Sequence, residues 1–432
     1  MRKKWFGLGF AVAASLGILA GCGGGNAAPG GTGENSAVQN TAESGDSAVS
    51  VEFLSQKRED VDLFDSILAD FMEKNPGISM TQTTTTGSVS FSSRVAANDV
   101  PELGNVYPST AYRVMAQEGL FMDLRDQEFL DRIPKEYLDM FTLEDGTVWG
   151  VPVSVNAFGL YINQDIYQQQ GLEIPKTFDE LIENCEKLKA AGITPFAFPY
   201  KEAGALRQLF ERTMGGAADH DFLKVCEEVG TEGKSFADYP KIVQGMEAFV
   251  RLLDYADTDP LGMDANDVAD AYANQQVAMV MNGNWGVSQY LALNPDLNFK
   301  VVLFPSITGI DSTTVGTGDM CFAISASASK EEQEACLKFI NYFLEPENIE
   351  YFASEDKVPS IVKGVQYKSE ELADIIDAIN NGGFTLSATV NWANGYQSTI
   401  QGELQSLIVD RDVPAFIETM DSFTKEIYSQ QE

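Results

Sequence analysis

The stretch VSVEFLSQKREDVDLFDSILADFMEKNPGISMTQTT, residues 49–84, decides the fold class of this chain. Residues 49–54 and 78–84 are rich in the β-branched and aromatic residues that are typical of strands. Between them, apolar residues recur with helical spacing until Pro76-Gly77 ends the helix. These apolar residues are Leu63, Phe64, Ile67, Leu68 and Phe71. A strand, a helix and a strand in this order predict a β-α-β unit, and therefore a parallel sheet.

The same alternation continues downstream and predicts an α/β protein, which at this length has two lobes. Two capping boxes, Thr177 with Glu180 and Ser329 with Glu332, each open an amphipathic helix. A strand is expected between these helices at residues 277–281. The alternation of strands and helices therefore extends over most of the chain.

The N-terminus has the parts of a bacterial export signal. A basic start is followed by an apolar run over residues 5–20 and by the tetrapeptide LAGC at residues 19–22. This tetrapeptide resembles the lipobox of bacterial lipoproteins, in which the cysteine is lipidated and becomes the first residue. The resemblance implies a signal peptide over residues 1–21 and a lipid anchor at Cys22, on the outer face of the cell membrane. The alternative is a transmembrane helix, but the run is shorter than the roughly 20 residues needed to span a bilayer.

Composition narrows the function further. Residues 22–49 contain no aromatic residue, leucine or isoleucine, which predicts a flexible linker behind the anchor. The formal net charge of −35 argues against a nucleic-acid partner. His220 is the single histidine, so neither a histidine-based zinc site nor a Ser-His-Asp triad is expected. We therefore predict no catalytic residue, no metal, no cofactor and a monomeric protein.

The cysteines and one acidic segment could in principle form a disulfide or a metal site. Cys185 and Cys336 each share a helical stripe with apolar residues, which predicts buried thiols; a disulfide or metal role is the alternative. The acidic residues 254–270 do not fit a calcium loop, because Val268 stands where a bidentate glutamate is required. We expect a loop and a helix start there.

Several short segments together carry a resemblance to a known family. They are FMEKNPGI at 71–78, WGVP at 149–152, GLYIN at 159–163, PKTFDEL at 175–181, AMVMNGNW at 278–285 and FAIS at 322–325. In order and spacing the chain resembles the family 1 extracellular solute-binding proteins of carbohydrate ABC transporters, which include maltose-binding protein. It departs from them at Glu102, where an aspartate is usual, and at Ile162, where a tyrosine is common.

The resemblance implies the periplasmic-binding-protein-like fold, with two discontinuous α/β lobes that are joined by hinge crossings and hold the ligand in a cleft between them. The implied crossings lie near residues 153–155, 316–320 and 358–364. The implied lobes are residues 50–154 with 320–362, and residues 155–319 with 363–432. Open sheets that face each other also place a ligand crevice at their strand ends.

The function implied is that of a substrate-binding lipoprotein of an ABC importer. Such a protein captures a carbohydrate, here an oligosaccharide, and delivers it to the permease subunits in the membrane without catalysing a reaction. Two alternatives remain open. The same fold can bind a non-sugar small solute, and a surface glycoside hydrolase needs only two suitably placed carboxylates.

A sugar has apolar faces and a rim of hydroxyl groups, so its site needs aromatic plates and polar side chains. Trp285 and Trp392 match family positions whose aromatic side chains stack on sugar. Asparagine and glycine neighbours indicate that both tryptophans are exposed on loops. The alternative for each is a core tryptophan.

The other predicted ligand-binding residues lie near strand ends or crossings. Those of the first lobe are Arg58, Glu59 and Tyr107, and those at or beyond the first crossing are Asn156, Phe158, Tyr200, Asn284, Asp319 and Tyr396. Trp149 also matches a family position, but one where the aromatic residue is buried ahead of the hinge. We therefore predict that Trp149 packs in the core.

Overall fold

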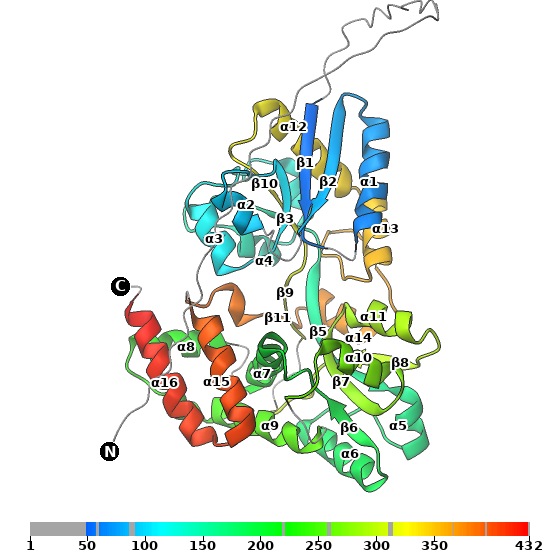
Figure 1. Ribbon diagram of the computed structural model, residues 1–432, viewed down its shortest axis with the longest axis vertical. Coiled ribbons are helices and arrows are strands. Elements are labelled where there is room, and N and C mark those ends of the chain that lie inside the picture. Colours follow the sequence, from blue (N-terminus) through cyan, green and yellow to red (C-terminus); the bar gives the residue numbers. More distant parts are fainter. Residues whose placement is uncertain are drawn as a thin grey trace, which may run out of the picture. The chain divides into compact units, whose positions relative to one another are not determined.

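The computed structural model describes residues 49–57, 60–85, 91–217, 221–256, 261–309, 314–365, 367–393 and 395–430. It is an α/β protein with two separate β-sheets (Figure 1). Among these residues, no helix is long and apolar enough to cross a membrane. The predicted signal peptide and Cys22, and nearly all of the linker, lie outside the described residues.

The first sheet has the strand order β2-β1-β3-β10-β4. Its strands are β1 (Val49–Ser55), β2 (Ile78–Thr84), β3 (Leu103–Val106), β4 (Val151–Pro152) and β10 (Cys321–Ile324). Strand β1 runs parallel to β2 and β3, whereas β10 is antiparallel to β3 and β4. The sheet is therefore completed by a strand that lies far away in the sequence.

The β-α-β unit predicted from residues 49–84 is confirmed. Helix α1 (Val61–Lys74) connects β1 and β2 and lies beside them in Figure 1. Its buried face carries Phe64, whose ring centroid is 5.1 Å from that of Phe53 in β1. Aromatic residues from the distant helix α12 (Lys330–Phe343) join the same core, where Phe343 is 4.9 Å from Phe322 of β10.

The other helices in the segments that form the first sheet are short, except α13 (Pro346–Asp356), which follows α12. They are α2 (Phe91–Ala96), α3 (Thr110–Gln117), η1 (Glu128–Arg132), α4 (Lys135–Leu138), η2 (Asp139–Phe141) and α13. The predicted packing role of Trp149 is confirmed, because its ring is buried between Phe121 and Phe141.

The second sheet has the order β11-β9-β5-β7-β6, with β8 also paired to β5. Its strands are β5 (Val155–Asn163), β6 (Thr194–Ala197), β7 (Val277–Gly283), β8 (Phe299–Val302), β9 (Thr314–Gly318) and β11 (Phe384–Leu386). Strand β5 is central because it pairs with β7, β8 and β9, all antiparallel.

Helices surround this second sheet. They are α5 (Gln164–Gln170), α6 (Phe178–Ala190), α7 (Ala203–Ala217), α8 (Phe222–Thr231), η3 (Phe236–Asp238), α9 (Pro240–Leu252), η4 (Leu253–Tyr255), α10 (Ala265–Ala273), α11 (Gly286–Leu293), α14 (Ala373–Asn380), η5 (Ala388–Val390), α15 (Tyr396–Asp410) and α16 (Val413–Ser429). Both predicted capping boxes form, at the starts of α6 and α12. Cys185 and Cys336 are buried free thiols, as predicted.

The chain passes between the two sheets in three places, and the first crossing is hydrogen-bonded to each of the other two. The amide of Val153 donates to the carbonyl of Met320 at 2.9 Å, and the amide of Ile361 donates to the carbonyl of Val153 at 3.3 Å. Ser154 and Ser360 form an isolated antiparallel bridge. The expected hinge therefore consists of three neighbouring backbone segments. The lobe boundaries drawn around it remain a prediction.

A buried ion cluster lies against this hinge. The Nζ atom of Lys57 is 3.1 Å from Oδ2 of Asp60 and 3.1 Å from Oδ2 of Asp319, and it also forms an ion pair with Asp356. Ser154 on the first crossing donates a hydrogen bond of 3.1 Å to Asp319 on the second. Burial raises the pKa of Asp356, whereas Lys57 lowers it and the other two carboxylates raise it. One ammonium group thus stabilises three carboxylates beside the crossings.

Replacing Lys57 by methionine leaves these carboxylates buried without their cation. We expect the free energy of unfolding at neutral pH to fall by about 3–5 kcal/mol, as for other buried ion pairs that lose one partner. The pKa of Asp356 then lies still further above its unfolded value, so stability returns as the pH falls and the carboxyl binds its proton. Denaturant unfolding should show a smaller loss at about pH 5 than at about pH 8.

Lys74→Met is the matched control, because Lys74 forms an exposed ion pair with Asp70. It should change the free energy of unfolding little at either pH. A Lys57→Met variant that loses no more stability than this control would contradict the assigned role of the cluster.

Candidate functional site

Trp285 is the predicted site residue with the most exposed side chain described, at 37%. It lies between β7 and α11, and its ring rests directly on Gly283 at the end of β7. A Cβ atom at Gly283 would lie 2.0 Å from the indole, so only glycine leaves room for the ring in this position. The local sequence Asn282-Gly283-Asn284 thus places an aromatic plate where part of it meets solvent.

Two further side chains extend this plate into the protein. Phe158 of β5 contacts Trp285 edge to face, with ring centroids 5.0 Å apart and an interplanar angle of 84°. The guanidinium carbon of Arg212, from α7, lies 3.3 Å from the centroid of the Phe158 ring. This is a cation–π contact, which partly compensates a buried charge. We call the three residues Trp285, Phe158 and Arg212 the Arg212 stack.

Arg212 is unusual because its charge is buried. Only 6% of the surface of Arg212 is exposed to solvent. Burial lowers the pKa of Arg212 well below its usual value, while Glu211 raises it and Arg207 lowers it. Arginine nevertheless stays protonated in proteins because its free pKa is so high. The stack therefore ends in a buried positive charge.

Glu211, the neighbour of Arg212 on α7, accepts two polar contacts through one carboxylate oxygen. Arg207 Nη1 lies 2.6 Å from Glu211 Oε2, and the Ser387 hydroxyl donates to the same oxygen at 2.9 Å. The second oxygen, Oε1, is buried and has no hydrogen-bond partner among the described residues. It is an acceptor that a bound molecule can use.

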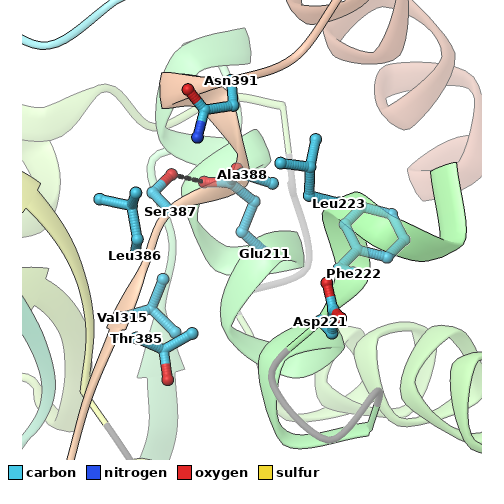
Figure 2. A pocket seen from close by; sticks show the side chains of 10 residues that line it. All are labelled: Glu211, Asp221, Phe222, Leu223, Val315, Thr385, Leu386, Ser387, Ala388 and Asn391. Atoms are coloured by element: carbon cyan, nitrogen blue, oxygen red, sulfur yellow. Dashed lines mark hydrogen bonds between the residues drawn. The ribbon is translucent and has the colours of Figure 1, made fainter. Parts of the chain in front are cut away.

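A cavity of about 190 Å³ adjoins this carboxylate (Figure 2). Its lining residues are Glu211, Asp221, Phe222, Leu223, Val315, Thr385, Leu386, Ser387, Ala388 and Asn391. Figure 2 shows the bonded Glu211 and Ser387 side chains, with apolar side chains such as Leu223 and Phe222 on the neighbouring wall. The volume is below the roughly 300–1,000 Å³ of a pocket for a whole drug-sized ligand. The cavity can therefore hold one part of a larger polar molecule.

Helix α3, which follows β3 of the first sheet, contacts the rim of this cavity. Arg113 Nη2 donates to Oδ1 of Asn391 at 3.1 Å, and the Thr110 hydroxyl donates to the carbonyl of Trp392 at 2.9 Å. These hydrogen bonds join a helix beside one sheet to a segment beside the other. The cavity itself is lined by residues of the second sheet and its helices, and one of them, Asn391, contacts helix α3.

The sequence of the chain also matches a known protein family. Residues 56–350 match the family described as bacterial extracellular solute-binding protein. The chain belongs to this family. The match includes strands of both sheets, the first two crossings and the three residues of the Arg212 stack. Strands β1 and β11, the last crossing and the cavity residues 385–391 lie outside it.

Individual relatives agree with this assignment. The multiple sugar-binding protein of Streptococcus mutans is 28% identical over 338 residues, which cover 75% of this chain and 78% of the relative. The melibiose/raffinose/stachyose-binding protein MelE of Bacillus subtilis is 20% identical over 280 residues, or 63% of this chain and 64% of the relative.

Solved structures are similar over nearly the whole described fold. The apo form of RafE from Streptococcus pneumoniae superposes with a TM-score of 0.78 at 23% identity, covering 89% of this chain and all of that one. RafE in complex with raffinose superposes with a TM-score of 0.75 at 23% identity, and the match covers 88% of this chain and 100% of that one. The predicted two-lobed solute-binding fold is confirmed.

The structure separates the predicted site residues into groups. Trp285 and Phe158 are brought together in the stack, and Tyr107 and Asn156 are half-buried. Arg58 and Glu59 lie outside the described residues. The other predicted residues are buried, and each has a structural environment of its own.

Trp392 differs from the prediction, because only 2% of it is exposed. Its ring centroid is 5.0 Å from that of Tyr396 and 6.4 Å from that of Phe222, inside the core of the second sheet. The prediction of an exposed loop tryptophan is therefore wrong at this position. The prediction relied on the polar neighbours of Trp392. One of them, Asn391, does line the cavity, but the Trp392 side chain itself lies in the core.

Two predicted tyrosines are also buried in that core. The Tyr396 hydroxyl lies 3.1 Å from Thr424 Oγ1, and burial raises its pKa well above the usual value. Tyr200 stacks on Phe198 with centroids 4.9 Å apart. Neither tyrosine lines the cavity described above.

The last two predicted residues, Asn284 and Asp319, hold the backbone in place. Asn284 Oδ1 accepts a hydrogen bond of 2.9 Å from the amide of Ala157, which fixes the turn that carries Trp285 to strand β5. Asp319 belongs to the buried ion cluster at the hinge. Asn284 therefore holds the Trp285 turn in place, and Asp319 contributes to the hinge.

Sequence reasoning missed Arg212, Glu211, Ser387 and Asn391. One signal was available: Arg207 and Glu211 are spaced i,i+4 in a helix whose other residues, apart from Gln208 and Arg212, are apolar or small. Charges in such a helix can lie on a buried face. In the described ranges, no group of three or more His, Cys, Asp or Glu side chains is arranged to hold a metal ion. Helix α10 starts within the acidic segment, with Asp264 as its N-cap.

Alanine substitutions of the two tryptophans should separate a core position from a surface position. Trp392→Ala removes a fully enclosed ring, so the free energy of unfolding should fall by about 3–5 kcal/mol. Trp285→Ala removes a ring that is partly in solvent. It should lower the free energy of unfolding by less than half of the loss expected for Trp392→Ala. Denaturant unfolding without ligand measures both values, and equal losses would contradict this division.

Proposed function

We propose that this protein captures an oligosaccharide outside the cell and delivers it to the permease of an ABC importer. The observation that carries the proposal is the partly exposed Trp285 plate at the end of the Arg212 stack, in a chain of the solute-binding family. An aromatic face matches the apolar face of a sugar ring. The binding step needs no covalent chemistry, and we propose that the protein is not an enzyme.

The polar groups of the cavity suit the hydroxyl groups of a sugar. The free oxygen of Glu211 accepts hydrogen bonds, and the side chain of Asn391 both donates and accepts them. Hydroxyl groups of a sugar can use all of these. The relatives named for binding multiple sugars, raffinose or stachyose support carbohydrate as the ligand class.

We further propose that closure of two lobes around the hinge traps the ligand, with the lobes divided at 154/155, 319/320 and 362/363. The hydrogen bonds from Thr110 and Arg113 to residues 391 and 392 are contacts that such closure would make and opening would break. A protein of this kind works as a monomer that docks on its permease. Tethering by a lipid on Cys22, on the outer face of the cell membrane, would keep it near that partner.

Removing the Trp285 ring should abolish tight sugar binding. A panel of raffinose, stachyose, chitin oligosaccharides and xylo-oligosaccharides is screened by thermal shift, and the best ligand is titrated by calorimetry. Trp285→Ala should weaken its binding by roughly 30- to 1000-fold, the loss of about 2–4 kcal/mol typical of an aromatic anchor.

Tyr351→Ala is the control, since Tyr351 is an exposed aromatic residue on α13. It should leave the affinity unchanged. Unchanged affinity in Trp285→Ala would remove this ring from the site, and sustained release of shorter sugars by the wild type would show an enzyme instead.

The anchor is tested separately in a bacterial host. Cys22→Ala removes the only thiol at the predicted cleavage point, so lipid labelling should cease and the protein should leave the membrane fraction. Ser15→Ala, in the apolar run of the signal, should keep both. A Cys22→Ala protein that still incorporates labelled palmitate and stays in the membrane fraction would refute the anchor.

A further inference from the structure

Among the described residues, none pairs with Arg212 as a buried arginine is normally paired. Its Nε is buried without a hydrogen-bond partner, and its guanidinium makes no hydrogen bond or ion pair with any other residue that the structure describes. Its one direct contact of note is with the ring of Phe158. Most buried charges in proteins are paired, because an unpaired one costs several kcal/mol.

The neighbouring charges do not remove this imbalance. Arg207 and Glu211 neutralise each other across 2.6 Å, and the Ser387 hydroxyl shares the same carboxylate oxygen. The three buried ionisable residues of α7 therefore carry one net positive charge. This charge is buried in a chain whose formal net charge is −35. Within the described part of the chain, these surroundings thus lack one negative group.

The position of Arg212 indicates where that group would come from. The Arg212 guanidinium and the exposed Trp285 indole contact the same ring, that of Phe158. A ligand stacked on Trp285 would therefore bind an aromatic ring that shares the neighbour Phe158 with Arg212. A guanidinium is planar and presents paired donors, which match the two oxygens of a carboxylate or phosphate.

We propose that Arg212 recognises an oxyanion on the bound ligand, which makes the preferred ligand an acidic oligosaccharide rather than a neutral one. This inference rests on the proposed carbohydrate-binding function. The shared chemistry is a pair of oxygens on one carbon or phosphorus atom that share a negative charge, and a uronate carboxylate or a sugar phosphate supplies it. The Arg212 charge is then paired only in the complex, so the free protein keeps an unfavourable group that binding relieves.

The test on the wild-type protein compares ligands that differ only in charge. Trigalacturonate is titrated against its methyl ester, trehalose 6-phosphate against trehalose, and raffinose serves as the neutral reference. We expect at least one acidic member to bind roughly 10- to 100-fold more tightly than its neutral partner, the value of a charged hydrogen-bonded pair. The pair that shows the preference identifies carboxylate or phosphate as the source.

Variants then assign the preference to this side chain. Arg212→Met keeps most of the volume without the charge and should bring the acidic and neutral affinities within about twofold of each other. Arg212→Lys keeps the charge but loses the paired donors, so part of the preference should remain. Arg251→Met removes an exposed charge on α9 and should leave the preference intact.

The outcomes separate this inference from the function on which it rests. If neutral sugars bind as tightly as their acidic partners, Arg212 does not select an oxyanion, and the carbohydrate-binding function stands. If an acidic preference persists in a folded Arg212→Met protein, another residue provides it and the assignment is overturned. If Arg212→Met does not fold, the wild-type comparison still decides whether an acidic group is preferred, and Arg212→Lys tests the residue. If none of the sugars binds, the proposed function itself fails.

Discussion

The hydrogen bonding of the first chain crossing to the other two is the constraint on which the rest of this structure depends. Each sheet takes strands from segments far apart in the sequence, as β10 does in the first sheet and β11 in the second. Such sheets can form only if the crossings meet at one place. The Lys57 cluster stabilises that place through side chains. It brings together residues beside the first sheet and Asp319 on the second crossing, so the hinge is defined by charge as well as by backbone pairing.

Helix α7 connects this frame to the candidate site. Glu211 and Arg212 are consecutive, so their side chains leave the helix about 100° apart. One reaches the cavity beside Ser387, and the other reaches the ring of Phe158. Burying three charges on one helix does not favour stability, because desolvation offsets most of the attraction between them. Such an arrangement is explained by binding, where unpaired groups gain their partners.

How much of the protein could be predicted follows from the range of the interactions involved. Helix α1 and its two strands were predictable because periodicity and the Pro-Gly stop act within a few residues of each other. Trp285 was predictable because Gly283 and its neighbours fix the local turn. Trp392 was not, because Phe222 of the distant helix α8 helps enclose its ring. The contact of Arg212 with Phe158 was not predictable either, because Arg212 lies on helix α7 and Phe158 on the distant strand β5.

The charge of the whole chain and the charge of the site act over different distances. A formal net charge of −35 repels an acidic ligand as it approaches, and salt screens this repulsion over about 8–10 Å. The attraction to Arg212 is buried and short-ranged, so salt screens it much less. Added salt should therefore speed the association of an acidic sugar while leaving its dissociation nearly unchanged. The reverse, slower association with salt, is the behaviour of a ligand drawn in by exposed positive groups. A buried arginine within an acidic protein thus combines selectivity for an anion with a surface that does not retain anions non-specifically.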